Sequence, residues 1–265
     1  MKFIPYSTLS PEFTMKFIPY VFLFCVCFCF ASNLAAAEGE QKYKILILTG
    51  GHDFEKKEFY KMFDDMPGIE YDKAELPKDM NLLAPGLEKK YDLLLTYDMN
   101  SFPTTDKQLE DYAALIKSGM PLLVFHHSLC GYENRPLYRE MIGGQYLQKP
   151  MEIDGKKYPA SAFKHGETIN VTIADKKHPI MQGIDDFAII DETYKDVYVR
   201  DDVHVLMTTD NPTSTKQLAW THKFGKGSVF TIALGHDHLS YENPNLTKIL
   251  LQGIKWCVTD TKQSK

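Results

Sequence analysis

Three short apolar runs in this chain each lead into a turn that carries histidine. The runs and their histidines are Lys44–Leu48 before His52, Leu122–Phe125 before His126 and His127, and Ser228–Ala233 before His236. Apolar runs bounded by turns are typical of strands buried on both faces of a parallel sheet. The carboxyl ends of such strands open on one edge, where α/β sheets bind ligands. The sequence therefore predicts one pocket that the histidines share.

The segments between these runs have helical spacing, which indicates strand–helix alternation. Phe54–Met66 carries an apolar stripe with Asp53 as its predicted N-cap. Thr104 and Thr105 open a helix over Asp106–Lys117. Further predicted elements are strands at Ile69–Lys73, Tyr91–Tyr97, Glu167–Ile173 and Val203–Met207, a polar insertion at Lys149–Ala160, a hairpin of Gln217–Phe224 with Ser228–Ala233, and a closing helix at Asn245–Cys257. This alternation predicts an α/β fold with right-handed crossovers and a mainly parallel sheet.

The first 37 residues have the pattern of a targeting segment. The motif MKFIPY occurs twice, so residues 1–14 are interpreted as an upstream start or an added scar, with Met15 as the natural start. The apolar run Val21–Phe30 and the small residues Ala35–Ala37 then form a secretory signal peptide, and this run is too short to span a bilayer. The alternative is a short membrane anchor. We therefore expect one domain over residues 38–265, periplasmic or secreted, with no stable transmembrane span after cleavage.

Charge and cysteine content narrow the classes of partner. The 265-residue chain has a formal net charge of -5, and it has no run of five or more Lys or Arg. This disfavours nucleic acid as a partner. After signal cleavage only Cys130 and Cys257 remain, so no disulfide framework is expected, and one bridge between them is the single pairing that the domain allows. The sequence leaves open whether the protein forms a homo-oligomer.

The predicted edge of the sheet carries groups suited to two kinds of chemistry. In the first, two or three of His52, His127, Glu192 and His236 hold a divalent metal such as Zn, because neutral imidazole and carboxylate bind such ions. In the second, histidine and glutamate act as general base and acid without a metal. Cys130, next to two histidines, is a candidate nucleophile. No HExxH-type spacing is present, so the residues leave this choice open.

Aromatic and polar side chains accompany the histidines in these loops. Aromatic faces can stack on the C–H faces of a sugar while polar groups bind its hydroxyls, and the alternative for each residue is ordinary packing. Tyr132, Tyr194 and Trp220 are the candidates for holding a sugar ring. The candidate polar contacts to substrate are Asp53, His126, Asp237 and His238.

Seven ordered segments of the chain are similar to the ThuA-like (trehalose utilization) proteins. The segments are ILILTGGHDF at 45–54, PLLVFHHSLCGY at 121–132, YREMIGGQY at 138–146, HPIMQGIDDF at 178–187, DETY at 191–194, FTIALGHD at 230–237 and QGIKW at 252–256. This family resembles the class I glutamine amidotransferases, so the resemblance implies a flavodoxin-like three-layer α/β sandwich. The amidotransferase strand ends in a nucleophilic cysteine, whereas PLLVFH ends here in His126, so glutaminase activity is not expected.

The resemblance implies a role in carbohydrate metabolism, with His52, His127, Glu192 and His236 as the matched pocket residues. Our first hypothesis is an exported enzyme that acts on a disaccharide or keto-sugar by His/Glu acid–base chemistry, with or without a metal. The second is a non-catalytic sugar-binding accessory protein. The third is a metal-dependent hydrolase of another substrate class. Fold-level kinship does not decide between them.

Overall fold

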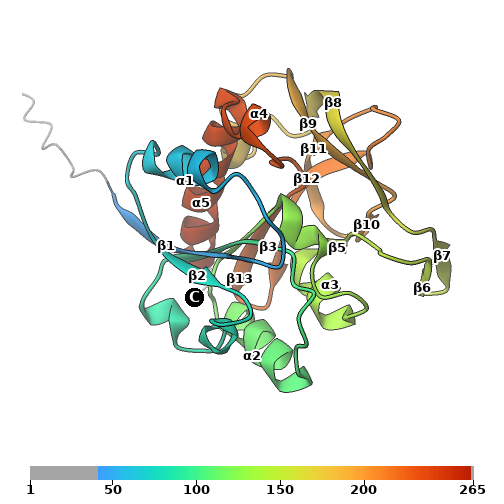
Figure 1. The fold of residues 1–265 in the computed structure, drawn as a ribbon. Coiled ribbons are helices and arrows are strands. Elements are labelled where there is room, and N and C mark those ends of the chain that lie inside the picture. The colour runs from blue at the N-terminus through green and yellow to red at the C-terminus, as the bar shows by residue number, and fades with distance from the viewer. Residues whose placement is uncertain (1–40, 264–265) are drawn as a thin grey trace, which may run out of the picture. The chain divides into compact units, whose positions relative to one another are not determined.

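A nine-stranded sheet forms the middle layer of the protein, and helices cover both of its faces (Figure 1). The computed structural model describes residues 41–263, so the predicted signal peptide lies outside the described residues. The strand order is β2-β1-β3-β4-β13-β12-β11-β8-β9. This arrangement is the expected flavodoxin-like α/β sandwich, and the fold prediction is confirmed.

One half of the sheet, from β2 to β13, is parallel throughout. Its strands are β2 (Ile69–Glu75), β1 (Tyr43–Gly50), β3 (Leu93–Asp98), β4 (Leu122–Phe125) and β13 (Gly227–Ile232). β1, β3, β4 and β13 are buried almost without interruption, as the apolar runs predicted. The carboxyl ends of β1, β4 and β13 therefore lie on the same edge of the sheet.

The other half of the sheet is antiparallel. Its strands are β12 (Gln217–Phe224), β11 (His204–Thr208), β8 (Ala162–Ile173) and β9 (Phe187–Lys195). β12 and β13 form the hairpin that the sequence predicted around Gly225-Lys226-Gly227. The mainly parallel arrangement thus holds for the half that carries the predicted histidines, and β8 and β9 extend the sheet beyond it.

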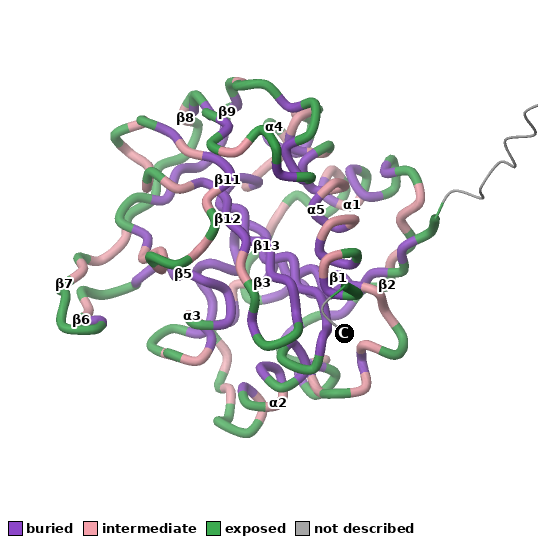
Figure 2. The backbone as a smooth tube through the Cα atoms, turned by 180° about the vertical axis from the view of Figure 1, so that it is seen from behind, coloured by how far each residue is buried: buried purple, intermediate pink, exposed green. Residues whose placement is uncertain are grey.

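Alternate residues of β1 belong to two different hydrophobic cores, one on each face of the sheet. Ile45 and Ile47 pack in the first core, with residues of the helices α1 (Lys56–Asp64) and α5 (Pro244–Gln263). Leu46 and Leu48 pack in the second core, with residues of α2 (Asp106–Lys117) and α3 (Pro136–Ile142). Figure 2 shows the central strands as the most continuously buried part of the backbone.

The remaining elements are short. They are the strands β5 (Gly144–Gln145), β6 (Met151–Ile153), β7 (Lys156–Tyr158) and β10 (Tyr198–Val199), the helix α4 (His238–Tyr241), and the 3-10 turns η1 (Met80–Leu82), η2 (Leu87–Lys89), η3 (His126–Cys130) and η4 (Pro179–Met181). The predicted polar insertion contains the exposed hairpin of β6 and β7. Within residues 41–263, no helix combines the length and the apolar character that crossing a membrane requires.

Three local predictions differ from the structure. The first helix begins at Lys56 with Glu55 at its N-cap position, so Asp53 does not cap it. β8 begins five residues before the predicted strand at Glu167, because an exposed first part, whose side chains do not alternate in polarity, also pairs with β9. Cys130 and Cys257 are both free and buried, so the disulfide that the sequence allowed is not formed.

Candidate functional site

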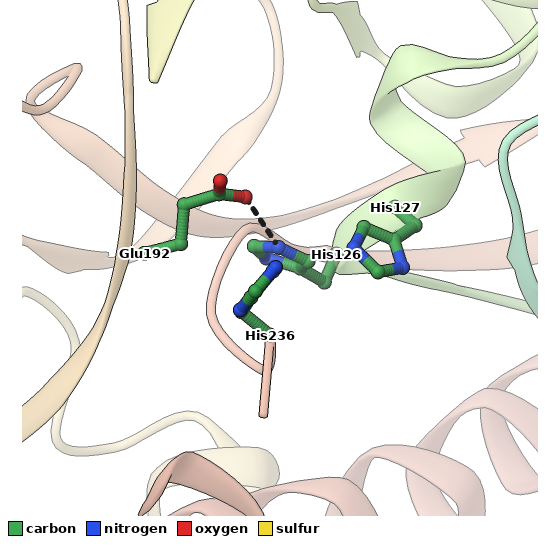
Figure 3. A group of neighbouring side chains, drawn as sticks. All are labelled: His126, His127, Glu192 and His236. Carbon is green, nitrogen blue, oxygen red and sulfur yellow. Dashed lines mark hydrogen bonds and ion pairs between the residues drawn. The ribbon is translucent and has the colours of Figure 1, made fainter. Parts of the chain in front are cut away.

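The histidines that follow β4 and β13 meet a glutamate from β9 at the carboxyl edge of the sheet. His126, His127, Glu192 and His236 each offer one ligand atom, and these atoms all lie within 4.8 Å of one another. Figure 3 shows the Glu192 carboxylate directed toward the His126 ring, with His127 and His236 beside it. His52, from the turn after β1, lies with its ring centroid 4.3 Å from that of His127. The sequence-predicted convergence of these loops is therefore present.

His126 occupies the centre of the group, and both of its ring nitrogens are engaged. Its Nδ1 lies 2.6 Å from the carbonyl oxygen of Ala233, which can only accept, so Nδ1 carries a hydrogen. Its Nε2 lies 3.1 Å from Oε2 of Glu192 and 2.9 Å from the hydroxyl of Tyr194. The residue has a positive φ of 41°, a conformation that only a few per cent of non-glycine residues adopt.

The contact with His126 decides the pKa of Glu192. Burial alone would raise the pKa of Glu192, but the hydrogen bond and the charge of His126 outweigh burial and hold that pKa below its ordinary value. Glu192 is therefore a carboxylate at neutral pH. The two side chains therefore form a buried pair through Nε2 of His126, and the hydroxyl of Tyr194 is the second group at that nitrogen.

His127 and His236 are neutral imidazoles. Burial lowers the pKa of His127 far below its ordinary value, with help from the neighbouring His126 and His52. Burial, followed by the charge of His126, also lowers the pKa of His236. Among the described residues, neither ring nitrogen of His127 has a hydrogen-bond partner, nor does Nδ1 of His236. The site thus holds neutral nitrogens that are free to bind a proton, a metal or a ligand.

The loop that carries His236 is fixed by Asp191, the buried neighbour of Glu192 on β9. The Asp191 carboxylate accepts hydrogen bonds from the backbone N–H of Gly235 at 2.6 Å and of His236 at 3.0 Å. It also accepts from the N–H of Glu192. Burial raises the pKa of Asp191 to about 6, against the opposing effects of His126 and these N–H groups. Asp191 therefore positions His236 relative to Glu192.

His165 belongs to the site although the sequence analysis did not single it out. Its Nδ1 lies 3.2 Å from Oε1 of Glu192, and its ring centroid lies 4.7 Å from that of His236. A register shift between Lys164 and Glu167, with Gly166 at a φ of 68°, marks a bulge at this point of β8. Bulges re-aim side chains near active sites. A glycine within an otherwise strand-like segment was the sequence signal for it.

These side chains line a cavity of about 140 Å³. The chemically active groups on its walls are His52, His127, His165, Glu192 and His236. Tyr146, Phe163 and Tyr194 supply aromatic surface, and Phe163 is 59% exposed. Cys130 also reaches the cavity, but burial raises the pKa of its thiol to about 12. A thiol in this state is a poor nucleophile, contrary to the lowered pKa that its histidine neighbours suggested.

Of the three aromatic residues predicted to hold a sugar, only Tyr194 lines the histidine cavity. Trp220 has no exposed surface, and its Nε1 donates to the carbonyl oxygen of Ile142 in the second core. Its assignment to sugar binding is therefore corrected to a packing role. Tyr132 lines a neighbouring cavity and stacks on Tyr138 at a centroid distance of 4.2 Å.

The polar candidates next to the histidines lie outside this cavity. Asp53 lines a separate shallow hollow beside the turn after β1. Asp237 is the N-cap of α4, where its side chain accepts from the N–H of Leu239. His238 is exposed and pairs with Glu55 at 3.0 Å. Asp237 still touches the site from outside, since its Oδ2 lies 3.6 Å from Nδ1 of His236.

The residues present fit a divalent metal. Three imidazoles and one carboxylate are the donor types that Zn²⁺ takes. His126 donates its other N–H to a backbone carbonyl, which is the usual arrangement of a metal-binding histidine. The structure brings His126 into this set and leaves His52 outside it, whereas the sequence had suggested the reverse. Metal would take the place of the direct contact between Nε2 of His126 and Glu192.

The fold and the site together define a three-layer α/β protein with a histidine–glutamate cavity at the carboxyl edge of its sheet. Residues 44–257 match the ThuA family, described as trehalose utilisation. The chain belongs to this family, which places it in carbohydrate metabolism. No curated protein sequence matches the chain.

Solved structures show the same fold. A ThuA-like protein from Parabacteroides merdae superposes with a TM-score of 0.67 at 17% identity, over 83% of this chain and 91% of that one. A ThuA-like protein from Bacteroides uniformis gives 0.61 at 15% identity, over 82% and 91%. A β-galactosidase from Bacillus circulans gives 0.53 at 12% identity, over 84% of this chain but 31% of that one. At these identities the likeness concerns the fold alone.

Proposed function

We propose that the protein is an exported enzyme that acts on a disaccharide or keto-sugar by histidine–glutamate acid–base chemistry. The observation that carries this proposal is the buried pair of His126 and Glu192 beside the neutral imidazoles of His127 and His236, in a cavity with aromatic walls. The family's description as trehalose utilisation supports a carbohydrate as the substrate. The signal-like sequence of residues 1–37 supports export.

The side chains that line the cavity divide into a base and a group that binds substrate. His236 is neutral, partly exposed and lines the cavity, so its imidazole can take a proton from the carbon beside a sugar carbonyl. The Glu192 carboxylate accepts a hydrogen bond from a sugar hydroxyl and fixes the ring. His126 has no exposed surface, so it acts as a positioning residue that holds the Glu192 carboxylate.

A divalent metal such as Zn would be held by His126, His127, Glu192 and His236. When bound, it would supply Lewis acidity that polarises a carbonyl or a water. The chain's own residues exclude bulk water in either state, because His126, His127 and Glu192 are all buried. Elemental analysis of protein that was prepared without chelators and without a histidine tag tests the metal.

Single-turnover incubation with keto-sugars tests the enzyme. We expect wild-type protein to convert the substrate and His236→Ala and His127→Ala to be slower by about 10²-fold or more. Equal rates in the wild type and both variants would exclude these roles. Stabilisation by a sugar without turnover would instead favour the non-catalytic binding protein.

A further inference from the structure

A second cavity adjoins the histidine cavity and is not used by the proposed chemistry. It has a volume of about 300 Å³, and Met99, Cys130 and Gln148 line both cavities. We propose that this second cavity binds a second ring of the substrate, so that the enzyme prefers a two-ring glycoside to a free monosaccharide. This inference rests on the proposed function and names its substrate class.

The wall between the two cavities carries a polar group suited to the linkage between two rings. Gln148 is exposed, and within residues 41–263 its side chain has no hydrogen-bond partner. A side-chain amide can donate and accept at once, so it can bind a bridging oxygen and a neighbouring hydroxyl. Met99 and Cys130, on the same wall, offer apolar surface to the C–H faces of the rings.

The far wall of the second cavity is polar and held in place. The Arg135 guanidinium donates to the carbonyl oxygen of Thr104 at 2.9 Å and to Asp106 at 2.7 Å, which leaves other N–H groups of its fork available. Asn100 is fixed by Thr104 and by the N–H of Phe102. Fixed donors and acceptors bind a ligand with little loss of side-chain entropy.

The charges of this wall favour a neutral ring over an anionic group. Arg135 is already paired with Asp106, and the Glu133 carboxylate lines the same cavity. Glu133 in turn lies 3.9 Å from Nζ of Lys149, so a phosphate or carboxylate ligand would meet a cation that is already compensated and a carboxylate. A sugar hydroxyl can donate to Glu133 and accept from Arg135, so both groups are satisfied at the same time.

Aromatic surface completes the second cavity. Phe102 is half-buried there, and Tyr132, predicted from the sequence to hold a sugar ring, lines this cavity. Tyr132 has a positive φ of 54°, which is rare for a bulky residue. Its N–H donates to the Asn100 carbonyl oxygen at 2.9 Å, and its own carbonyl accepts from Gln145 at 3.0 Å. Strain that is held by several bonds in this way concentrates at ligand sites.

The test compares one-ring and two-ring probes on variants that fill or spare the second cavity. Affinities of methyl glucoside and trehalose, and of their 3-keto forms, are measured by isothermal titration calorimetry. Ser101→Trp fills the cavity, because Ser101 is exposed and lines only the second one. Ser101→Ala is the matched control that removes the hydroxyl without adding volume. Gln148→Ala removes the shared amide.

We expect wild-type protein to bind a two-ring probe at least tenfold more tightly than the matching one-ring probe. Ser101→Trp should abolish this preference, Gln148→Ala should reduce it, and Ser101→Ala should retain it. Three outcomes would overturn the second subsite: equal affinity for both probes, no binding of either probe, or a two-ring preference that Ser101→Trp leaves unchanged. Product analysis with the 3-keto probes separates the two claims: a retained two-ring preference without turnover would refute the proposed enzyme alone, and turnover without the preference would refute the subsite alone.

Discussion

The carboxylate of Glu192 lies 3.1 Å from Nε2 of His126, although the two residues are 66 positions apart in the chain. One comes from the antiparallel strand β9 and the other from the turn after the parallel strand β4. Their pairing lowers the pKa of Glu192 and directs the second carboxylate oxygen toward His165 and the cavity. Replacement of either residue should therefore alter both activity and metal binding.

We expect Glu192→Gln to lower turnover by about 10- to 10²-fold, the usual cost of losing a hydrogen bond to a charged group that holds the substrate. The amide keeps the shape of the side chain but has one acceptor oxygen, whereas the carboxylate offers one oxygen to His126 and the other to His165. Circular dichroism should show a retained fold, and stopped-time assays with keto-sugars measure the rate. Glu167→Gln, on the same sheet at the exposed β8, is the matched control. Equal losses in the two variants would contradict a specific role for Glu192.

Zinc binding distinguishes the set of ligands seen in the structure from the set suggested by the sequence. We expect His126→Asn to weaken Zn²⁺ binding by at least tenfold and His52→Asn to leave it within threefold, because His52 lies outside the cluster of four ligand atoms. Calorimetry in buffers of different ionisation enthalpy should also detect proton release on binding. An equal effect of the two substitutions would refute this assignment.

Asp191→Asn should disturb the loop of His236. The amide retains one acceptor oxygen. Its NH₂ group would face one of the backbone N–H groups that donate to the carboxylate in the wild type. We expect a loss of about 1–3 kcal/mol in the free energy of unfolding, the usual cost of leaving a buried polar group unsatisfied. Urea unfolding measures this loss, and the NMR shift of the His236 ring should change with it. An unperturbed His236 signal would show that Asp191 does not position the loop.

Substitutions of Trp220 and Phe163 should have opposite effects: one should lower stability and the other should lower sugar affinity. Trp220→Phe removes a fully buried indole and its hydrogen bond to Ile142, so we expect a loss of about 1–3 kcal/mol of stability. Phe163→Ala removes an exposed ring at the cavity, so stability should stay within about 0.5 kcal/mol while sugar affinity falls. Urea unfolding and calorimetry measure the two effects. Weaker sugar binding in Trp220→Phe at unchanged stability would contradict the packing role of Trp220.

The buried carboxyl of Asp98 should give stability a pH dependence. Burial raises its pKa from 3.8 to about 7, although Ser128 donates to its Oδ1. Between about pH 4 and pH 7 the native state therefore holds a proton that the unfolded chain releases, so its contribution to stability is lost as pH rises through this window. Above about pH 7 the contribution no longer changes.

Comparison of the wild type with Asp98→Asn isolates this effect from other titrating groups such as His222. The variant should gain about 1–4 kcal/mol relative to the wild type between pH 4 and pH 7.5, since each pKa unit corresponds to about 1.4 kcal/mol. Urea unfolding at both pH values measures the gain. A stability difference that is independent of pH would show that Asp98 titrates normally in the folded protein.

The strand ends could be located from sequence because buried parallel strands appear as apolar runs, and parallel topology places their ends together. His52, His127 and His236 were found in this way. Tertiary placement was harder to foresee. The burial of Trp220 depends on the approach of α3 to β12, and the entry of His165 depends on a bulge. Neither the hydrophobic period nor local motifs specify such contacts between distant elements.

The contribution of β9 has a consequence for how the active protein is assembled. Glu192 comes from β9 at the sheet's edge, whereas His126 follows the interior strand β4. A fragment of the chain that carries only one of these two residues therefore cannot form the site. A polypeptide divided in the exposed turn between β6 and β7, which lies between His126 and Glu192 in the chain, would become functional only after its fragments recombine. Enzymatic turnover would then serve as a sensitive reporter of fragment complementation.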